Sequence, residues 1–600
     1  MKSLSFDIAS LREAYRGGEY TPADIARETL RRIEAYDDPA VWISRVEGRE
    51  VLARAEALTR EDPADATPLW GIPFAVKDNI DVEGLPTTAG CPAFAYTPKQ
   101  NATVVARLLA AGAILVGKTN LDQFATGLVG TRSPYGAPRS VFDSRYVSGG
   151  SSSGSGVAVA AGLVSFALGT DTAGSGRVPA AYNNIVGLKP TKGLISTSGV
   201  VPACRSLDCV SIFTATTGDA MDVLRAAEGF DAADIYSRPR AAGADIPEQF
   251  RFGVLASADR EFFGDDSSAK LYEEAIARLS SLGGTAIVID YAPFRAAAEL
   301  LYQGAWTGER LAAIREFMVR HEDAMDPSVR AIIAGARSLS AVDAFEGQYR
   351  LAAARRAADA EWARIDCLLL PTVPTQDTVE DVMADPIARN ARLGLYTNFV
   401  NLLDCCAIAV PAGFRTNGLP FGVTLIAPAF CESALAPIAD ALHRAGKFGM
   451  GKARNAALSD ASRLTRMPDA GRVDIFVVGA HLSGMPLNHE LLGAGGVLRG
   501  PAQTTVDYRL YVLPRTNPAK PGMMRDPKGG ARIAGEIWSL SAEAFGRFVA
   551  KIPAPLGIGK VALDNGQTVS GFVAESYAIQ NATDITALGG WRAYMQSRDR

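Results

Sequence analysis

The sequence has little histidine and little net charge. Its 600 residues include only four histidines, and none precedes residue 321. The net charge is -4 and no run of lysine or arginine occurs, which argues against nucleic acid or an anionic membrane as a partner. The longest apolar stretch, residues 156–169, has 14 residues and is interrupted by glycine, whereas a membrane span needs about 20. We therefore expect neither a membrane nor a nucleic-acid partner.

Cysteine usage and the first residues predict a cytoplasmic protein. The seven cysteines are an odd number, all lie between Cys91 and Cys431, and they lack metal-ligand spacing. Residues 1–20 contain no apolar core of signal-peptide length. We expect reduced cysteines and no metal.

The pattern along the chain predicts two α/β domains. Thr21, Pro22 and Asp24 form a helix-start signal at the head of an amphipathic stretch that ends near residue 35. Residues 72–81 and 113–120 are typical of strands and residues 102–112 of a helix; residues 421–428 predict a further strand. Residues 446–470 lose apolar periodicity and predict a linker between a domain of residues 1–445 and a smaller α/β domain of residues 471–600.

Ser175 lies in an unusually small-residue stretch, GTDTAGSGRVPAA at residues 169–181, and a second such stretch, SGGSSSGSG, occupies residues 148–156. Glycines let backbone N–H groups approach and point at one ligand atom. A flexible linker is disfavoured by the apolar surroundings, and a phosphate loop would need a Lys-Ser/Thr ending, which is missing. The pattern favours acyl transfer, in which a serine attacks and backbone N–H groups hold the oxyanion.

A serine nucleophile needs a base, and the distribution of histidine makes a Ser-His-Asp triad less favoured without excluding it. Lysine can act instead if burial keeps it neutral. Lys77 ends an apolar predicted strand and could therefore lie in a dry interior. Taken alone, it could equally be a solvated lysine at a strand end.

Residues 149–181 resemble the signature of the amidase-signature enzymes, serine hydrolases with a Ser-Ser-Lys triad, and the wider resemblance covers about residues 20–445. It implies an α/β fold in which helices cover both faces of a large mixed β-sheet, and an activity without metal or organic cofactor. It also implies a cis peptide at Gly150–Ser151, while we interpret Asp171 and Arg177 as a structural ion pair. The site residues that the resemblance implies are Ser175 as nucleophile, Ser151 as bridging serine, Lys77 as base, and the backbone of Thr172, Ala173, Gly174 and Ser175 as oxyanion hole.

Residues 299–314 carry the expectation about the substrate. Tyr302 and Arg310 are eight residues apart, about two helical turns, which predicts one helix face. An ordinary amphipathic helix with its arginine in water is the alternative. The segment resembles allophanate hydrolases, a group within the amidase-signature enzymes. That resemblance implies that Gly127, Tyr302 and Arg310 bind a small anionic urea-derived substrate, that the protein is a homodimer, and that it works with a urea carboxylase.

The second domain resembles the γ-glutamylcyclotransferase-like fold and the tails of allophanate hydrolases. Cyclotransferases carry a general-base glutamate after the strand that matches residues 535–540, but residues 548–561 contain no acid, which argues against that activity. The resemblance implies a role for His489 in decarboxylating the dicarboxylate product. A docking or assembly role stays open.

Two other functions remain possible at this point. One is an amidase-signature enzyme that acts on a neutral or larger amide. The other is a partner-dependent subunit that supplies ammonia to an amidotransferase, which would require glutaminase activity.

Overall fold

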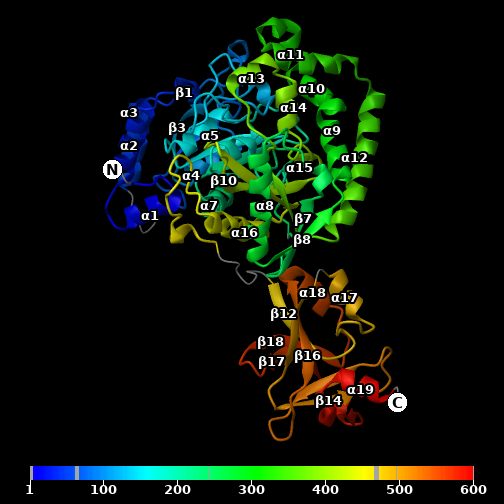
Figure 1. The fold of residues 1–600 in the computed structure, drawn as a ribbon. Coiled ribbons are helices and arrows are strands. Elements are labelled where there is room, and N and C mark those ends of the chain that lie inside the picture. The colour runs from blue at the N-terminus through cyan, green and yellow to red at the C-terminus, as the bar shows by residue number, and fades with distance from the viewer. Residues whose placement is uncertain (1–3, 61–66, 242, 465–471, 495, 599–600) are drawn as a thin grey trace. The chain divides into compact units, whose positions relative to one another are not determined.

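A computed structural model of the protein describes residues 4–60, 67–241, 243–464, 472–494 and 496–598. The chain forms two compact units, Met1–Arg466 and Met467–Arg600 (Figure 1). Part of the predicted linker, residues 446–464, belongs to the first unit, where the Lys452 backbone N–H donates to the Ala160 carbonyl at 2.9 Å. Residues 465–470 of that linker lie outside the described residues.

The first unit is built on an 11-stranded mixed sheet. β2 is parallel to β3 and β4, and β7 is parallel to β8 and β9, while the other neighbours are antiparallel. In spatial order the strands are β1 (Trp42–Arg45), β3 (Ile114–Thr119), β2 (Pro73–Lys77), β4 (Phe166–Asp171), β6 (Cys209–Thr214), β5 (Val186–Lys189), β10 (Cys405–Phe414), β11 (Pro420–Pro428), β9 (Cys367–Pro371), β7 (Phe250–Leu255) and β8 (Gly284–Ile289).

Helices cover both faces of this sheet, which confirms the expected fold class. α7 and α16 pack against each other and on β6 and β10, whereas α5 and α6 pack against each other and on β4 and β5. The helices of the unit are α1 (Ile8–Arg16), α2 (Pro22–Glu34), α3 (Gly48–Thr59), α4 (Thr103–Ala110), α5 (Ser153–Ala160), α6 (Val178–Tyr182), α7 (Thr217–Ala227), α8 (Asp266–Ser281), α9 (Ala292–Gln303), α10 (Trp306–His321), α11 (Pro327–Ala334), α12 (Ala341–Trp362), α13 (Val379–Ala384), α14 (Ala388–Leu393), α15 (Phe399–Leu402) and α16 (Glu432–Gly446).

Local sequence signals correctly predicted several of these elements. Thr21 caps α2 and forms a capping box with Asp24, and Pro22 occupies the first helical position. The strands predicted at residues 72–81, 113–120 and 421–428 are β2, β3 and β11, and the helix predicted at 102–112 is α4. Helix capping and apolar periodicity both depend on residues close in sequence, so they can be recognised without knowledge of the rest of the fold.

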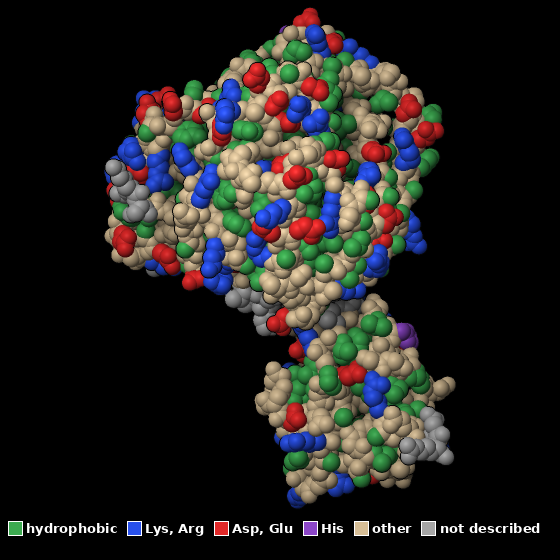
Figure 2. Space-filling view, in the orientation of Figure 1, with side chains coloured by type: hydrophobic (Ala, Val, Ile, Leu, Met, Phe, Trp, Pro, Cys, Tyr) green, Lys and Arg blue, Asp and Glu red, His purple; other side chains and the backbone are tan. Residues whose placement is uncertain are grey.

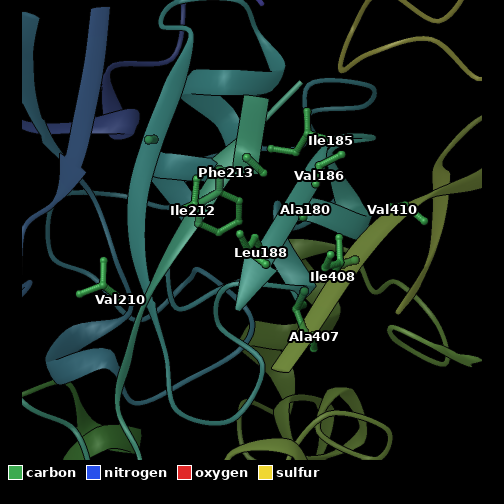
Figure 3. Packing of buried hydrophobic residues seen from close by; sticks show 14 of the residues in the cluster. Ala180, Ile185, Val186, Leu188, Val210, Ile212, Phe213, Ala407, Ile408 and Val410 are labelled. Atoms are coloured by element: carbon green, nitrogen blue, oxygen red, sulfur yellow. The ribbon is translucent and has the colours of Figure 1, made fainter. Parts of the chain in front are cut away.

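The middle of the sheet is continuously apolar because helices cover it on both sides. Leu188 of β5 pairs with Ile212 of β6 on one side and with Ile408 of β10 on the other, and all three are buried (Figure 3). This apolar centre lies next to β4 and then β2 in the sheet; Lys77 ends β2, and the end of β4 leads to Ser175.

The second unit is a small α/β domain, as expected, although its likeness to the γ-glutamylcyclotransferase-like fold stays a prediction. A five-stranded sheet has the order β13-β16-β12-β18-β17, and a three-stranded sheet has the order β15-β14-β19. The elements are β12 (Arg472–Val477), α17 (Asn488–Gly493), β13 (Val497–Gln503), β14 (Tyr508–Val512), β15 (Pro521–Arg525), β16 (Ala534–Ser541), α18 (Ala542–Val549), β17 (Leu556–Ala562), β18 (Thr568–Ala574), β19 (Thr583–Asp584) and α19 (Trp591–Arg598).

Charge on the surface is mixed in sign. Positive and negative side chains are interspersed over the visible face of the first unit (Figure 2), in keeping with the small net charge. Across the described ranges, every helix is too short or too polar to span a membrane.

Candidate active site

Lys77 is a buried lysine held by two hydroxyl groups. It is the last residue of β2, its side chain is fully buried, and its Nζ lies 2.7 Å from Ser151 Oγ and 2.8 Å from Thr170 Oγ1. Burial lowers the pKa of Lys77 to about 7, although the carboxylates of Asp122, Asp208 and Asp171 act in the opposite direction. A large fraction of the amine is therefore neutral near pH 7 and can accept a proton.

The Gly150–Ser151 peptide bond is cis, as the resemblance implied. Ser151 follows Gly149 and Gly150 just before α5, and its side chain is fully buried. The Ser151 carbonyl accepts a hydrogen bond from the Asp122 backbone N–H at 3.0 Å. The hydroxyl of Ser151 is thus held against Lys77 by the backbone on which it sits.

The loop that carries Ser175 is braced by a buried ion pair. Arg177 donates from Nε and Nη2 to the two oxygens of Asp171, each at 2.9 Å, and both side chains are fully buried. Asp171 also accepts from the Gly176 backbone N–H at 2.9 Å. Bidentate geometry of this kind fixes orientation as well as distance, so the pair holds the turn between β4 and α6.

Four consecutive backbone donors in this turn are open. No described residue accepts a hydrogen bond from the backbone N–H of Thr172, Ala173, Gly174 or Ser175. Gly174 must be glycine because a Cβ there would lie 2.5 Å from Thr397 Oγ1. Buried backbone donors without a partner are rare and costly, which fits a place where an oxyanion is held.

Ser175 and Arg310 contact two adjacent residues: Ser175 contacts Gly127, and Arg310 contacts Thr126. The Ser175 hydroxyl lies 3.5 Å from the Gly127 carbonyl, and Arg310 Nη1 donates to Thr126 Oγ1 at 3.0 Å. Arg310 is buried, its Nε has no hydrogen-bond acceptor, and no carboxylate of the described residues forms an ion pair with it. A buried guanidinium in this state is suited to an anion supplied from outside the chain.

Tyr302 also reaches Arg310, but not in the way that the sequence predicted. The expectation of one continuous helix face is wrong, because α9 ends at Gln303 and α10 begins at Trp306. Gly304 makes the break in an extended conformation, and a Cβ there would lie 2.5 Å from the Leu300 carbonyl oxygen. Arg310 Nη2 nonetheless lies 3.4 Å from the Tyr302 hydroxyl across the break.

Asp122 organises the glycines around the site. Its carboxylate accepts from the backbone N–H groups of Gly130 and Arg132, each at 3.0 Å. A Cβ on Gly127 would lie 2.5 Å from Asp122 Oδ2, and one on Gly150 would lie 2.1 Å from it. Both glycines are therefore required by the close approach of one buried carboxylate.

Sequence reasoning missed four residues that shape the site: Thr170, Asp122, Thr126 and Asp208. Thr170 could have been suspected, since it lies five residues before Ser175 on the strand that leads to it. The other three become visible only when the strand order and the loops bring distant segments together.

The two histidines of the first unit lie elsewhere. His443 Nε2 is 2.9 Å from the Gly449 carbonyl, and burial lowers the pKa of His443 to about 4. His321 ends α10 and packs against Phe317. No described hydrogen bond joins either imidazole to Ser151 or Ser175.

In the second unit, His489 is exposed, and its Nδ1 lies 2.9 Å from the Pro486 carbonyl. A different histidine, His481, lines a cavity of about 100 Å³ together with Glu490, Lys520 and Lys551. His481 Nε2 is 3.0 Å from Glu490 Oε2, and its ring stacks on Phe572 with the ring centres 5.2 Å apart. The sequence around His489 gave no sign that His481, and not His489, lines the cavity.

Comparison with known proteins assigns both units. Residues 24–436 match the Amidase family, and residues 473–596 match the allophanate hydrolase C-terminal domain. The chain therefore belongs to the Amidase family, and it is an amidohydrolase.

Relatives that match both units are more specific. Urea amidolyase of Lachancea kluyveri is 44% identical over 577 residues, which cover 94% of this chain and 31% of that protein. The chain thus spans about a third of the length of this relative. A solved structure of allophanate hydrolase from Kluyveromyces lactis is 39% identical, with a TM-score of 0.78 and coverage of 99% of this chain and 100% of that one.

Another relative matches a smaller share of the chain. A glutamyl-tRNA(Gln) amidotransferase subunit of Synechococcus sp. (strain RCC307) is 35% identical, in a match that covers only 72% of this chain but 96% of that one.

Proposed function

We propose that this chain is an allophanate hydrolase that uses a Ser-Ser-Lys triad. The observation that carries the proposal is the buried, unpaired guanidinium of Arg310, which Thr126 and Gly127 link to the Ser175 hydroxyl. Allophanate is a urea that bears a carboxylate. Arg310 would bind the carboxylate, the Tyr302 hydroxyl would help to hold it, and Gly127 would line the same pocket. The amide carbonyl would then lie at Ser175.

The chemistry follows from the proton affinities of the three side chains. Neutral Lys77 takes the proton of Ser151, and Ser151 takes the proton of Ser175 as its oxygen attacks the amide carbonyl. The backbone N–H groups of Thr172, Ala173, Gly174 and Ser175 stabilise the resulting oxyanion. The C–N bond breaks, the leaving nitrogen receives the proton from Ser151, and ammonia departs. Water then hydrolyses the acyl-serine and releases a nitrogen-bridged dicarboxylate.

The second unit has a proposed role in the loss of carbon dioxide from that dicarboxylate, with His489 as the residue to test. Its cavity of about 100 Å³ is lined by His481, two lysines and one carboxylate, Glu490, so its lysines outnumber its acid, which favours a small anion. His489→Ala in the full chain should lower carbon dioxide release while ammonia release persists, and His321→Ala is the matched exposed control. A docking role instead predicts unchanged product ratios and an altered oligomeric state.

The setting is proposed from the same reasoning. A urea carboxylase, on the same or another chain, supplies the allophanate, in keeping with the name and greater length of the urea amidolyase relative. All seven cysteines are buried and none of them forms a disulfide bond, which supports a reducing cytoplasm. We propose a homodimer, which light scattering coupled to gel filtration would test.

The deciding experiment measures ammonia release by the purified protein from allophanate, biuret, malonamate and glutamine. Turnover of allophanate well above the other three supports the proposal, and Ser175→Ala should abolish it with the fold intact. Preferred turnover of glutamine would favour the ammonia-supplying amidotransferase subunit. Preferred turnover of biuret, a neutral amide, would favour an amidase without an anion requirement.

A further inference from the structure

A second buried carboxylate, Asp208, joins the two halves of the candidate site. Its Oδ2 accepts from the Ala203 backbone N–H at 2.9 Å and its Oδ1 from the Cys204 backbone N–H at 3.2 Å. The Thr172 hydroxyl donates to the same Oδ1. Thr172 is the first of the four residues with open backbone donors, so Asp208 holds that end of the turn.

The segment that Asp208 closes also grips the helix of Arg310. The Ser206 backbone N–H and hydroxyl donate to the two carboxylate oxygens of Glu309, each at 2.7 Å. Cys204 Sγ lies 3.5 Å from the Trp306 carbonyl oxygen. Trp306 and Glu309 are in the first turn of α10, and Glu309 immediately precedes Arg310.

The connection has little freedom. Asp208 and Cys204 are buried, and Asp171, which precedes Thr172, pairs across the sheet with Cys209, which follows Asp208. The α10 end needs such a tether, because the break at Gly304 separates it from α9. A shift of α10 would therefore be transmitted to the Thr172 turn through residues 203–208.

We propose that Asp208 is a positioning residue, which couples the position of Arg310 to the backbone donors at Thr172. Binding of the substrate carboxylate would in this way align the oxyanion donors. This inference rests on the proposed function and adds to it a specificity device, since a neutral amide would leave α10 without its anion.

The test uses kcat and KM of the full chain with allophanate. Thr172→Val removes the hydroxyl that Asp208 holds and should lower kcat about 10- to 100-fold with KM within about twofold. Thr172→Ser keeps the hydroxyl and should recover most of the kcat that Thr172→Val loses. Thr372→Val is the matched control. Thr372 is also a buried threonine, but its hydroxyl forms a 2.8 Å hydrogen bond with Thr424 Oγ1 and does not contact Asp208.

Coupling is measured with Glu309→Gln, which disturbs the grip of Ser206 on α10 and should lower kcat at least about threefold. Combined with Thr172→Val, it should add little further loss, so that kcat of the double variant stays within about twofold of that of Thr172→Val alone. Fully multiplied losses, an unchanged kcat in Thr172→Val, or equal defects in Thr172→Ser and Thr172→Val would overturn the proposal. If Thr172→Val shows no thermal unfolding transition like that of the control, it does not fold and cannot serve as the test. In that case an unchanged kcat in Glu309→Gln would overturn the proposal.

Failure of this inference can be told apart from failure of the proposed function. If the unchanged protein prefers another amide, the proposed function fails, and the kcat comparison with that amide still tests the hold of Asp208 on the Thr172 turn. If allophanate is the preferred substrate and the variants behave additively, the function stands and the coupling does not.

Discussion

The guanidinium of Arg310 faces the Tyr302 ring across a break between two helices, with Cζ 5.2 Å from the ring centre. Tyr302 lies on α9 and Arg310 on α10, so no single helix holds the two side chains together. Their contact depends on the turn at Gly304 and on the hydrogen bond from Arg310 to Thr126. The proposed anion site is thus assembled from three segments, which makes its geometry sensitive to changes that leave the charge intact.

Replacement of Arg310 by lysine should weaken substrate binding although it keeps the positive charge. Lysine cannot form two parallel hydrogen bonds to a carboxylate, and the loss of one charge-assisted bond costs about 1.5–3 kcal/mol. We expect KM for allophanate to rise about 10- to 100-fold. Arg315→Lys, an exposed change on the same helix, is the control. An unchanged KM would place the carboxylate elsewhere.

The activity should depend on pH through Lys77. Burial lowers the pKa of Lys77 to about 7, and only the neutral amine can accept the proton from Ser151. We expect kcat/KM to rise about tenfold per pH unit below 7 and to level off above it. Ammonia release measured from pH 5 to 9, with Ser175→Ala protein to record spontaneous decomposition, checks this. A flat profile through pH 7 contradicts a lysine base.

Gly127→Ala should damage catalysis through steric displacement alone. The new methyl group would lie 2.5 Å from Asp122 Oδ2 and would push away the carbonyl that contacts Ser175. A displacement of about 1 Å can reduce kcat/KM about 100-fold. Gly308→Ala is the control, since its Cβ would meet only Leu339 Cδ1 at 3.9 Å. Equal activity of the two variants would argue that the loop yields without consequence.

Asp219 should make the stability of the first unit depend on pH. It is buried in α7 and accepts from the backbone N–H groups of Ile8 and Ala9, each at 3.2 Å. Burial, reinforced by Asp7, raises the pKa of Asp219 from 3.8 to about 8. The folded protein therefore keeps a proton that the unfolded chain releases above about pH 4. Its stabilising effect is complete below that pH and is lost as pH rises through 8.

Asp219→Asn has no titrating group at this position and should remove this dependence. Between pH 5 and 8 the unfolding free energy of the unchanged protein should fall, relative to the variant, by up to about 1.4 kcal/mol per pH unit. Thermal unfolding in paired buffers measures the difference. Asp323→Asn, at an exposed carboxylate, serves as control. Parallel pH curves for Asp219→Asn and the unchanged protein would show that Asp219 is ionised in the fold.

The sequence alone determined the parts of this protein that depend on short-range physics. The cap at Thr21, the apolar strand that ends at Lys77, and the glycines around Ser175 are each encoded within a few residues. The signature resemblance then pointed to Ser151 and to the fold class. Such patterns survive in isolation because capping, periodicity and backbone freedom are local properties.

Only the tertiary structure decided which distant residues complete the site. Asp122 reaches Gly127 and Gly150, and Thr126 reaches Arg310 184 residues away, because the order of strands and loops brings them together. The break at Gly304 reversed the simplest reading of the Tyr302 and Arg310 spacing. Asp208 acquired its partners in the same way. Long-range contacts of this kind leave no periodic trace, since they depend on how whole segments pack.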